Sequence, residues 1–549
     1  MSSNEYDAVI IGSGAGGGTS AWALSKAGFK VLILEAGPHY DPFEDYPLDT
    51  PEWERAFPHK VSTEGRQLFA QMQPLEDKWN DLRSWNHLSG PLNKTESRQS
   101  FGYHHVVGVG GSSLHFTGEA HRMNPKAMQM KSRFAVAADW PMTYQDLEPF
   151  YGQAEEVVGV AGPARDNLRP RSSPYPQEAH PMSYASKQLE KGFNKLGLEV
   201  TNNSLAVLSS PKNNRANCNY CGGCLRGCPR KDKGSIDVTY LEEAIATGQC
   251  HIKAGCTVTF IEADKNDKVK GVHYHDGEEN HFVNTPLLIV ACGAVETPRL
   301  LLLSESPTAP QGLGNESGEL GKNFMETLLW SSSGLHPQAM GSHRGLPVDS
   351  ICWDYNNPDA IPGVIGGCRF APSQAESDLV GPISYANRVV GGWGKSHRDK
   401  MKRVFGHVLS LTGIGESLPN SQTFVALHSS EKDALGKPKA LISSYVDDMA
   451  ARRIAFMRDT CRSILEATGV TEIFEEFSSY DIFSSSHVFG TCRMGHNPDT
   501  SVVDPWCRSH RWKNLYVIDA SVFPSSGGGE SPGLTIQAIA LRAAGKIIG

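Results

Sequence analysis

A glycine-rich loop near the N-terminus constrains the fold of this chain more than any other segment. The sequence GSGAGG begins at Gly12, follows the apolar run 7–11 and opens a helix predicted over 19–28. In the pattern G-x-G-x-x-G the first glycine permits a tight turn, the second lets the backbone approach a pyrophosphate, and the third lets helix and strand pack closely. In this chain the three glycines are Gly12, Gly14 and Gly17. The start of the helix presents free N–H groups to phosphates, which predicts a dinucleotide site.

A second buried strand is predicted over 30–34 and ends at Glu35. A carboxylate at that point accepts hydrogen bonds from a ribose 2′-hydroxyl and disfavours a 2′-phosphate. The strand, loop, helix and strand therefore predict the βαβ start of a parallel sheet that binds FAD or NAD rather than NADP. The alternative interpretation is a glycine-rich turn that binds no ligand.

The size and charge of the chain exclude several other classes of protein. A chain of 549 residues is longer than a domain with a single hydrophobic core usually is, so we expect two domains or one large elaborated domain. A net charge of −8 repels phosphate backbones, which argues against nucleic acid as a partner. The longest apolar run, 287–295, is too short to cross a bilayer. The N-terminus shows no signal peptide, so we expect a cytoplasmic protein; the alternative is a periplasmic protein exported with a signal-bearing partner.

Five further segments resemble the glucose–methanol–choline (GMC) oxidoreductase family. They occur in family order, and the resemblance reaches from residue 7 to residue 549, with only a loose match over 327–484. The segments are GVGGSSLH at 108–115, the acidic and aromatic stretch 139–151, GAVETP at 293–298, HVFGTCRMG at 487–495 and LYVIDASVFP at 515–524. The resemblance implies FAD as the cofactor, a two-domain fold and the oxidation of an alcohol.

The fold class implied by this resemblance is α/β, with a Rossmann-like FAD-binding domain and a discontinuous α+β substrate-binding domain built on an antiparallel sheet. We expect the FAD-binding domain over 1–326, with a lid at 38–100 and a cysteine-rich insertion at 215–230. The strand-like alternation over 327–484 is assigned to the substrate-binding domain. The C-terminal part, 485–549, returns to the FAD-binding domain and carries the catalytic histidine.

The resemblance also implies which residues contact the flavin. Gly110, Gly111 and Ser112 match the loop over the isoalloxazine ring. His115 matches a position that bonds covalently to the flavin in some members, and the alternative is an uncharged histidine that forms a hydrogen bond nearby.

Further expected FAD contacts come from three other segments of the chain. Asp519 and Ala520 match flavin-contacting residues, and Thr535 lies at the start of the last predicted helix. Val258 lies where family members contact the adenine half of FAD. The alternative is an ordinary valine of a β-strand that contacts no cofactor.

His487 matches the catalytic base of the family. Alcohol oxidation requires removal of the hydroxyl proton as hydride leaves the carbon, and a histidine, with an ordinary pKa of about 6.5, can accept that proton near neutral pH. The alternative is a capping or core histidine. The family usually has a second His or Asn before the final helix, whereas this chain has Ser531 there, with Glu530 beside it as another candidate.

Four cysteines form the densest cluster in the sequence, with the spacing C-x2-C-x2-C-x3-C followed by proline. These candidate metal ligands are Cys218, Cys221, Cys224 and Cys228. The spacing is typical of ferredoxin-like iron–sulfur sites and fits structural zinc less well. Three ligands suit a three-iron cluster, whereas a four-iron cluster needs all four cysteines or a remote ligand such as Cys250 or Cys256. The alternative is a thiol-rich structural loop without metal.

The cysteine segment resembles those of bacterial FAD-dependent sugar dehydrogenases with a three-iron–four-sulfur cluster, and of long-chain alcohol oxidases. The leading hypothesis is a dehydrogenase that oxidises a sugar, polyol or related alcohol and passes electrons through the cluster to an acceptor protein or small subunit. The alternatives are an alcohol oxidase that uses dioxygen on a less polar alcohol, with a structural cysteine cluster, and a non-catalytic flavin-bearing subunit. Aromatic residues in 327–484 could stack on a sugar ring or belong to the core: Trp353, Tyr385 and Trp393.

Overall fold

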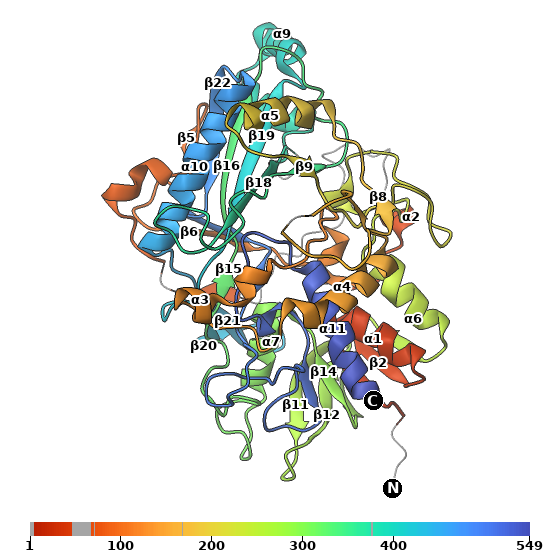
Figure 1. The fold of residues 1–549 in the computed structure, drawn as a ribbon. Helices are drawn as coiled ribbons and strands as arrows, with labels where there is room; N and C mark the ends of the chain where they lie inside the picture. The colour runs from red at the N-terminus through yellow and green to blue at the C-terminus, as the bar shows by residue number, and fades with distance from the viewer. Residues whose placement is uncertain (1–4, 47–66, 71, 167, 375–376) are drawn as a thin grey trace.

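The computed structural model describes residues 5–46, 67–70, 72–166, 168–374 and 377–549. Within these ranges, no helix is both long enough and apolar enough to cross a membrane. The first described residues and the C-terminus lie at the bottom of Figure 1, beside the parallel sheet. Part of the predicted lid falls outside the described residues, namely 47–66.

The parallel sheet predicted from the first loop is present and has five strands. In spatial order they are β10 (Cys250–Lys253), β2 (Val31–Leu34), β1 (Ala8–Ile11), β14 (Leu288–Val290) and β25 (Leu515–Val517). Ile10 of β1 pairs with Ile33 on one side and with Ile289 on the other. Strands β1, β2 and β14 are entirely buried runs of aliphatic residues, as expected for parallel strands that are covered on both faces.

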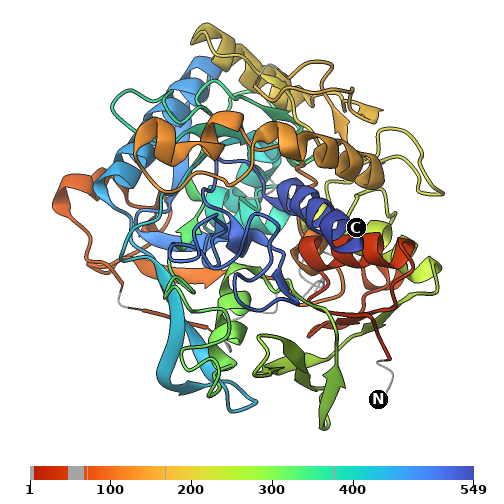
Figure 2. The same cartoon turned by 60° about the horizontal axis from the view of Figure 1, so that its bottom comes forward.

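Helices from both ends of the chain cover this sheet. Helix α1 (Ala15–Lys26) packs against α11 (Gly533–Ile548), and α11 packs in turn against α4 (Tyr144–Val158). Figure 2 shows α1 and α11 side by side. Because β25 and α11 complete the core that β1 and α1 begin, the first and last parts of the chain form one unit.

A second, antiparallel sheet has six strands. In spatial order they are β18 (Cys368–Pro372), β19 (Val408–Gly415), β16 (Leu328–Leu335), β22 (Glu472–Ser478), β4 (Trp85–Asn86) and β5 (Gly90–Pro91). Helix α10 (Asp448–Thr468) packs on β16 and β19, and α5 (Tyr184–Lys195) packs on α10. This sheet occupies the upper half of Figure 1. The expected α/β class with a second antiparallel sheet is therefore confirmed, and β4 and β5 come from the segment that the sequence assigned to the lid.

Smaller sheets join the two main ones. The sequence predicts a hairpin with strands over 258–263 and 269–275, and the structure confirms it as β11 (Thr257–Ala263) and β12 (Val269–His275). Strand β13 (Asn280–Asn284) extends this sheet. The other strand pairs and triplets are β20 (Phe424–Lys432) with β21 (Pro438–Ser443) and β3 (Gln67–Phe69), β23 (Ile482–Ser485) with β6 (Gln99–Tyr103), β15 (Met325–Glu326) with β24 (Val488–Phe489), β17 (Ser350–Ile351) with β9 (Thr201–Asn202), and β7 (Ala161–Gly162) with β8 (Gln177–Glu178).

The remaining helices are mostly short. They are α2 (Pro42–Asp45), α3 (Met130–Phe134), α6 (Glu242–Ala246), α7 (Gly293–Leu303), α8 (Pro382–Ser384) and α9 (Gly394–Val404). The sequence predicts a helix over 137–161, whereas α4 begins only after Thr143. Thr143 and Asp146 form a reciprocal capping box there, which satisfies N–H groups of the first turn and fixes the start of the helix.

Candidate active site

A cavity of about 730 Å³ opens at the carboxyl ends of the parallel strands. Ligands of open α/β sheets bind at this edge, and the volume is within the range of cofactor sites. The predicted catalytic and FAD-binding residues that line the cavity are Gly12, Gly14, Glu35, Gly111, Ser112, His115, Val258, His487, Asp519, Ala520 and Ser531. The structure thus brings together residues from nearly the whole length of the chain.

Three predicted cofactor-binding residues lie just behind this wall. Gly17 packs against the loop itself, because a Cβ atom there would lie 1.9 Å from the carbonyl oxygen of Gly12. The backbone N–H of Gly110 donates to Ser13 Oγ over 3.0 Å. The Thr535 hydroxyl lies 2.9 Å from the Tyr151 hydroxyl. These three residues support the cavity wall without lining it.

The first loop has the geometry that a pyrophosphate requires. Gly12 has a φ of +91°, which favours glycine, and a Cβ atom at Gly16 would lie 1.7 Å from the carbonyl oxygen of Ile518. Helix α1 therefore lies directly on the strands, with its first turn at the cavity. Its N-cap residue is Gly14, which has no side chain to occupy the free N–H groups. These N–H groups and the cavity beside them fit a dinucleotide.

Glu35 ends β2 at the cavity wall and is held by neighbouring donors. Its carboxylate accepts hydrogen bonds from the Ser13 N–H over 2.9 Å, the Ser13 hydroxyl over 2.6 Å and the Gly37 N–H over 2.9 Å. Ser13, which the sequence interpretation did not single out, thus connects the glycine loop to Glu35. The expected contact of Glu35 with a ribose stays a prediction.

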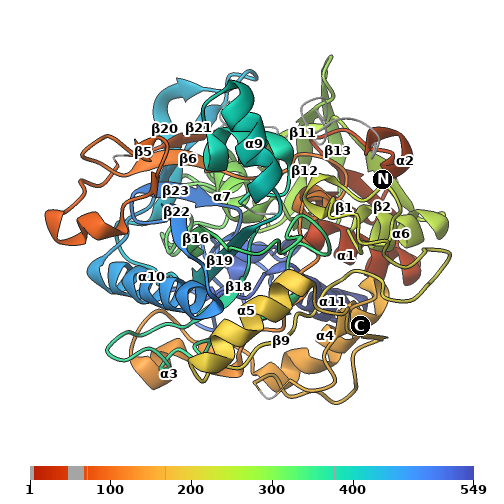
Figure 3. The ribbon, with the colours of Figure 1, turned by 90° about the horizontal axis from the view of Figure 1, so that it is seen from above.

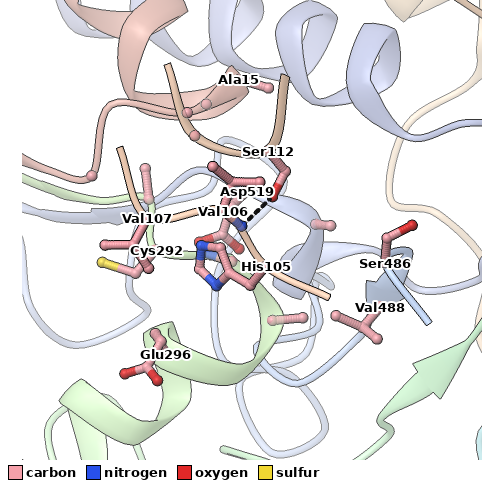
Figure 4. Close-up of a pocket in the computed structure, with 18 of the residues that line it drawn as sticks. Ala15, His105, Val106, Val107, Ser112, Cys292, Glu296, Ser486, Val488 and Asp519 are labelled. Atoms are coloured by element: carbon pink, nitrogen blue, oxygen red, sulfur yellow. Dashed lines mark hydrogen bonds between the residues drawn. The ribbon is translucent and has the colours of Figure 1, made fainter. Parts of the chain in front are cut away.

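The loop predicted to cover the flavin contacts the first loop. A Cβ atom at Gly111 would lie 2.8 Å from the Cα atom of Gly14, so the two glycine-rich segments bound the same cavity. The Val106 N–H donates to Ser112 Oγ over 3.4 Å, as the dashed line in Figure 4 shows. Figure 4 also shows His105 near the centre of the pocket, a residue for which the sequence gave no signal.

Asp519 connects the end of β25 to the start of α7. Its carboxylate accepts hydrogen bonds from the Gly293 N–H over 2.9 Å, the Thr297 hydroxyl over 2.6 Å and the Ser521 N–H over 2.8 Å. Burial raises the pKa of Asp519. The carboxylate therefore fixes the start of α7 against the end of β25 at the wall of the cavity, where Figure 4 labels it.

The cysteine-rich segment is attached directly to the loop that carries His115. The His115 ring nitrogen Nδ1 lies 2.6 Å from the carbonyl oxygen of Leu225, which also lines the cavity. The buried Lys233 ammonium donates to the carbonyl oxygens of Leu114, Phe116 and Cys224 over 3.0, 3.1 and 2.7 Å. Hydrogen bonds therefore join the two segments directly, although they are about a hundred residues apart in the sequence.

The four clustered cysteines differ in exposure. Cys218 and Cys224 are buried, Cys221 is exposed, and the Cys228 thiol donates to Asp232 over 3.0 Å. Burial, together with the charges of Asp232 and the neighbouring thiols, raises the pKa of Cys218 to about 12. Across the described part of the chain, no group of three or more His, Cys, Asp or Glu side chains is arranged to hold a metal ion. The three-iron or four-iron cluster expected from the cysteine spacing therefore stays a prediction.

His487 lies between β23 and β24, and its ring faces the cavity. Its carbonyl oxygen accepts hydrogen bonds from the Thr327 N–H and the Ser485 hydroxyl, each over 3.0 Å, which fixes the backbone. Burial lowers the pKa of His487 to about 4, while the charge of Glu119 raises it and that of Arg369 lowers it. The imidazole is therefore neutral at pH 7 and able to accept a proton.

Glu119 lines the same cavity and is the acidic group that the sequence interpretation missed. Its carboxylate accepts hydrogen bonds from Arg369 over 2.7 Å, Ser531 Oγ over 2.8 Å and Asn203 over 3.0 Å. Burial by itself would raise the pKa of Glu119, but Arg369 and these hydrogen bonds keep it well below its ordinary value. Glu119 is therefore ionised at neutral pH and lies at the end of the cavity that His487 occupies.

The two residues considered for the second catalytic position are placed differently. Ser531 lines the cavity, with its hydroxyl donating to Glu119 and its N–H donating to His121 over 3.1 Å. The Glu530 carboxylate instead accepts hydrogen bonds from Arg169 over 2.9 Å and Asn356 over 3.0 Å, outside the cavity wall. The interpretation of Glu530 as a catalytic group therefore has no geometric support.

The aromatic residues considered for sugar stacking do not line the cavity. Trp353 stacks on Arg169, whose guanidinium carbon lies 3.8 Å from the ring centroid. Tyr385 is fully buried and accepts a hydrogen bond from the Val408 N–H over 3.2 Å. Trp393 is 88% exposed.

Comparison with known proteins agrees with this geometry. The chain matches the GMC oxidoreductase profile over residues 95–328 and 419–540, and an NAD(P)-binding Rossmann-like domain over residues 10–40. It is 28% identical to the fructose dehydrogenase large subunit of Gluconobacter japonicus, covering 99% of this chain and 97% of that protein. It is 27% identical to 2-methyl-1,2-propanediol dehydrogenase of Mycolicibacterium austroafricanum (99% and 95% covered) and 29% identical to paromamine 6′-oxidase of Streptomyces fradiae (99% and 91% covered).

Solved structures share the fold at lower sequence identity. Formate oxidase of Aspergillus oryzae has a TM-score of 0.68 at 15% identity, with 100% of this chain and 98% of that chain covered. Pyridoxine 4-oxidase of Mesorbium loti has a TM-score of 0.61 at 19% identity, with 99% of each chain covered. The profile matches and the full-length relatives together establish the family. This chain belongs to the GMC oxidoreductase family and is an FAD-dependent oxidoreductase that acts on CH–OH groups.

Proposed function

We propose that this protein oxidises one hydroxyl group of a sugar, polyol or related alcohol, with His487 as the base and an external electron acceptor. The observation that carries the proposal is the shared cavity, which a neutral imidazole, an ionised carboxylate and the glycine-rich loop all line. The names of the relatives, among them a fructose dehydrogenase and a propanediol dehydrogenase, favour a hydroxylated substrate.

The residues of the cavity suit FAD in a definite orientation. The first turn of α1 after Gly14 would hold the pyrophosphate, and Glu35 the ribose of the adenosine half. Val258 lies on the wall that would face the adenine, whereas Ser112 and Asp519 lie on the wall that would face the flavin. When bound, FAD supplies the acceptor for a hydride.

In the proposed reaction the substrate O–H and C–H bonds both break and a C=O bond forms. His487 takes the hydroxyl proton, and the hydride leaves the carbon with its electron pair for the cofactor. The imidazolium that results is positively charged in a buried site. The Glu119 carboxylate stabilises this charge, because opposite charges attract strongly where water is scarce.

We propose that Glu119 takes over the role of the second catalytic residue that the family resemblance led us to expect at position 531. The Ser531 hydroxyl already donates its hydrogen bond to Glu119, so it does not donate one to a substrate oxygen. Arg369 donates a hydrogen bond to the Glu119 carboxylate and stabilises its negative charge, and the carboxylate lines the cavity. It can therefore accept a hydrogen bond from a substrate hydroxyl as well as balance the charge on His487.

The electron acceptor is the least constrained part of the proposal. The relatives include dehydrogenases and oxidases, and the name of one of them, a large subunit, denotes a protein with further subunits. We favour an acceptor protein or small subunit over dioxygen. The iron–sulfur path expected from the cysteine spacing stays a prediction, and no step of the proposed reaction depends on it.

Anaerobic mixing of the FAD-loaded protein with a panel of sugars, polyols and simple alcohols tests the reaction. We expect at least one polyhydroxylated compound to bleach the visible absorbance of the flavin, and an artificial dye to restore it faster than dioxygen does. Rapid reoxidation by air with peroxide formation would favour the oxidase alternative. Iron content, measured on the same preparation, decides whether the cysteine cluster binds iron. Protein that does not take up flavin would refute the proposal.

A further inference from the structure

Trp393 is the most exposed large apolar side chain in the described part of the chain. Its exposed fraction is 88%, and it is the N-cap residue of α9. A single exposed tryptophan of this size is informative, because burial of an aromatic ring is favourable and exposed apolar surface often marks an interaction site. Leu88, which is 41% exposed, contacts the same loop near Gly391.

The loop before α9 holds Trp393 in a fixed position. Gly392 and Gly394, on either side of it, have φ values of +73° and +77°, which favour glycine. A ring nitrogen of His397 lies 2.7 Å from the carbonyl oxygen of Gly391 and so ties the loop to the first turn of the helix. The backbone conformation and this hydrogen bond therefore fix the position of the exposed ring.

Helix α9 places a row of basic side chains beside this ring. Lys395, Arg398 and Lys402 occur at positions i, i+3 and i+7, which share one face of a helix. The basic residues of α9 are Lys395, Arg398, Lys400, Lys402 and Arg403, against one acidic residue, Asp399. This concentration of positive charge occurs on a chain whose net charge is −8.

The opposite side of α9 is fixed to the protein. Met401 and Val404 pack against the buried cluster that contains Tyr385 and Val408. Figure 1 shows α9 at the end of the molecule furthest from the chain termini, and Figure 3 shows it nearest the viewer when that end is seen from above. The basic side of the helix therefore faces solvent.

We propose that this region, the α9 patch (Trp393, Lys395, Arg398, Lys402 and Arg403), docks the protein onto an anionic lipid surface. Tryptophan is enriched at membrane–water boundaries, and clusters of Lys and Arg on amphipathic helices bind anionic headgroups. Lysine is depleted in protein–protein interfaces, which makes a protein partner a poorer fit to this lysine-bearing patch. Trp393 enters the headgroup region, and the basic residues contact phosphates.

Co-sedimentation of the full-length protein with vesicles tests this proposal. We expect binding to phosphatidylcholine vesicles that contain phosphatidylglycerol and not to vesicles of phosphatidylcholine alone, with weaker binding as salt screens the charges. Since the whole chain is negatively charged, binding requires the local patch. Replacing two cations, Lys395→Gln with Lys402→Gln, weakens partitioning roughly 30-fold.

A matched control uses two exposed lysines at the far end of the molecule. Lys265 and Lys268 lie in the turn between β11 and β12, at the bottom of Figure 1, and Lys265→Gln with Lys268→Gln leaves vesicle binding unchanged. Trp393→Ala removes the fluorescence change on vesicle binding while the melting temperature stays that of the parent, because the ring is exposed.

Three results would overturn the proposal. The first is no binding to vesicles that contain phosphatidylglycerol, and the second is an equal loss in the control pair. The third is retention by an acidic polypeptide that depends on Lys395 and Lys402 when vesicles retain nothing, which would identify a protein partner instead.

Discussion

Replacement of His487 by glutamine tests whether this side chain is the buried, neutral base of the proposed reaction. Burial lowers the pKa of His487 from 6.5 to about 4. In the unfolded chain the ring binds a proton below its ordinary pKa, whereas in the folded protein it stays neutral until about pH 4. The unfolded state therefore binds more protons in this window, and the folded state loses stability as the pH falls through it.

The magnitude follows from the two pKa values. The difference between 6.5 and about 4 corresponds to about 3 kcal/mol, of which about 2 kcal/mol has been lost at pH 5. Glutamine does not titrate, so the variant lacks this loss. Between pH 7.5 and pH 5, the free energy of unfolding of the parent should fall by about 2 kcal/mol more than that of His487→Gln.

Urea unfolding at the two pH values, followed by tryptophan fluorescence, measures this difference. Rapid mixing with substrate measures the other expected effect, a flavin reduction slower by roughly 10²- to 10⁴-fold at unchanged FAD content. The exposed His39, which does not line the cavity, supplies a control for the kinetic effect, because His39→Gln should leave the rate of flavin reduction unchanged. Parallel pH dependences of parent and variant would refute the buried, neutral histidine, and flavin reduction within tenfold of the parent would refute its role as the base.

Two further predictions concern the cavity. Glu119→Gln should slow flavin reduction at least tenfold, because a neutral amide does not offset the charge that forms on His487. Ser531→Ala keeps the carboxylate and should slow flavin reduction less. Equal rates of flavin reduction in the two variants, measured by anaerobic rapid mixing, would count against the role of Glu119. Gly17→Ala should yield folded protein with little bound FAD, measured by its visible absorbance, because the added Cβ would lie 1.9 Å from the Gly12 carbonyl oxygen. Gly545→Ala is the matched control, since nothing lies within 4 Å of its added Cβ, and equal flavin content in both variants would contradict this reasoning.

Local sequence patterns were sufficient for the dinucleotide loop and its flanking elements. The strand that ends at Ile11, a glycine turn from Gly12 and a helix after it all occur, because turn geometry depends on neighbouring residues, although the helix begins at Ala15 and not at position 19 as predicted. The hairpin β11–β12 was predictable for the same reason. The edge of the second sheet was not, since β4 pairs with β22, a strand almost four hundred residues later, and β5 pairs with β4.

The catalytic end of the cavity depended on the tertiary structure. His487 could be recognised from its own segment, but Glu119 could not, because its role follows from Arg369 and Ser531, which are 250 and 412 residues away. Neither the hydrophobic periodicity nor the residue spacing within one segment predicts a contact between residues so far apart in the sequence. Burial likewise decided between interpretations of the aromatic residues, since Tyr385 is in the core and Trp393 is at the surface.

The sequence by itself thus determined the parallel sheet, the glycine loop and the family, because these rest on short-range sterics and on motifs that are read in order. The tertiary structure alone decided which charged groups share the cavity, how the cysteine segment is joined to His115 and which aromatic ring is exposed. The physical reason is that electrostatic effects and burial depend on distance in space, which a folded chain sets independently of distance along the sequence.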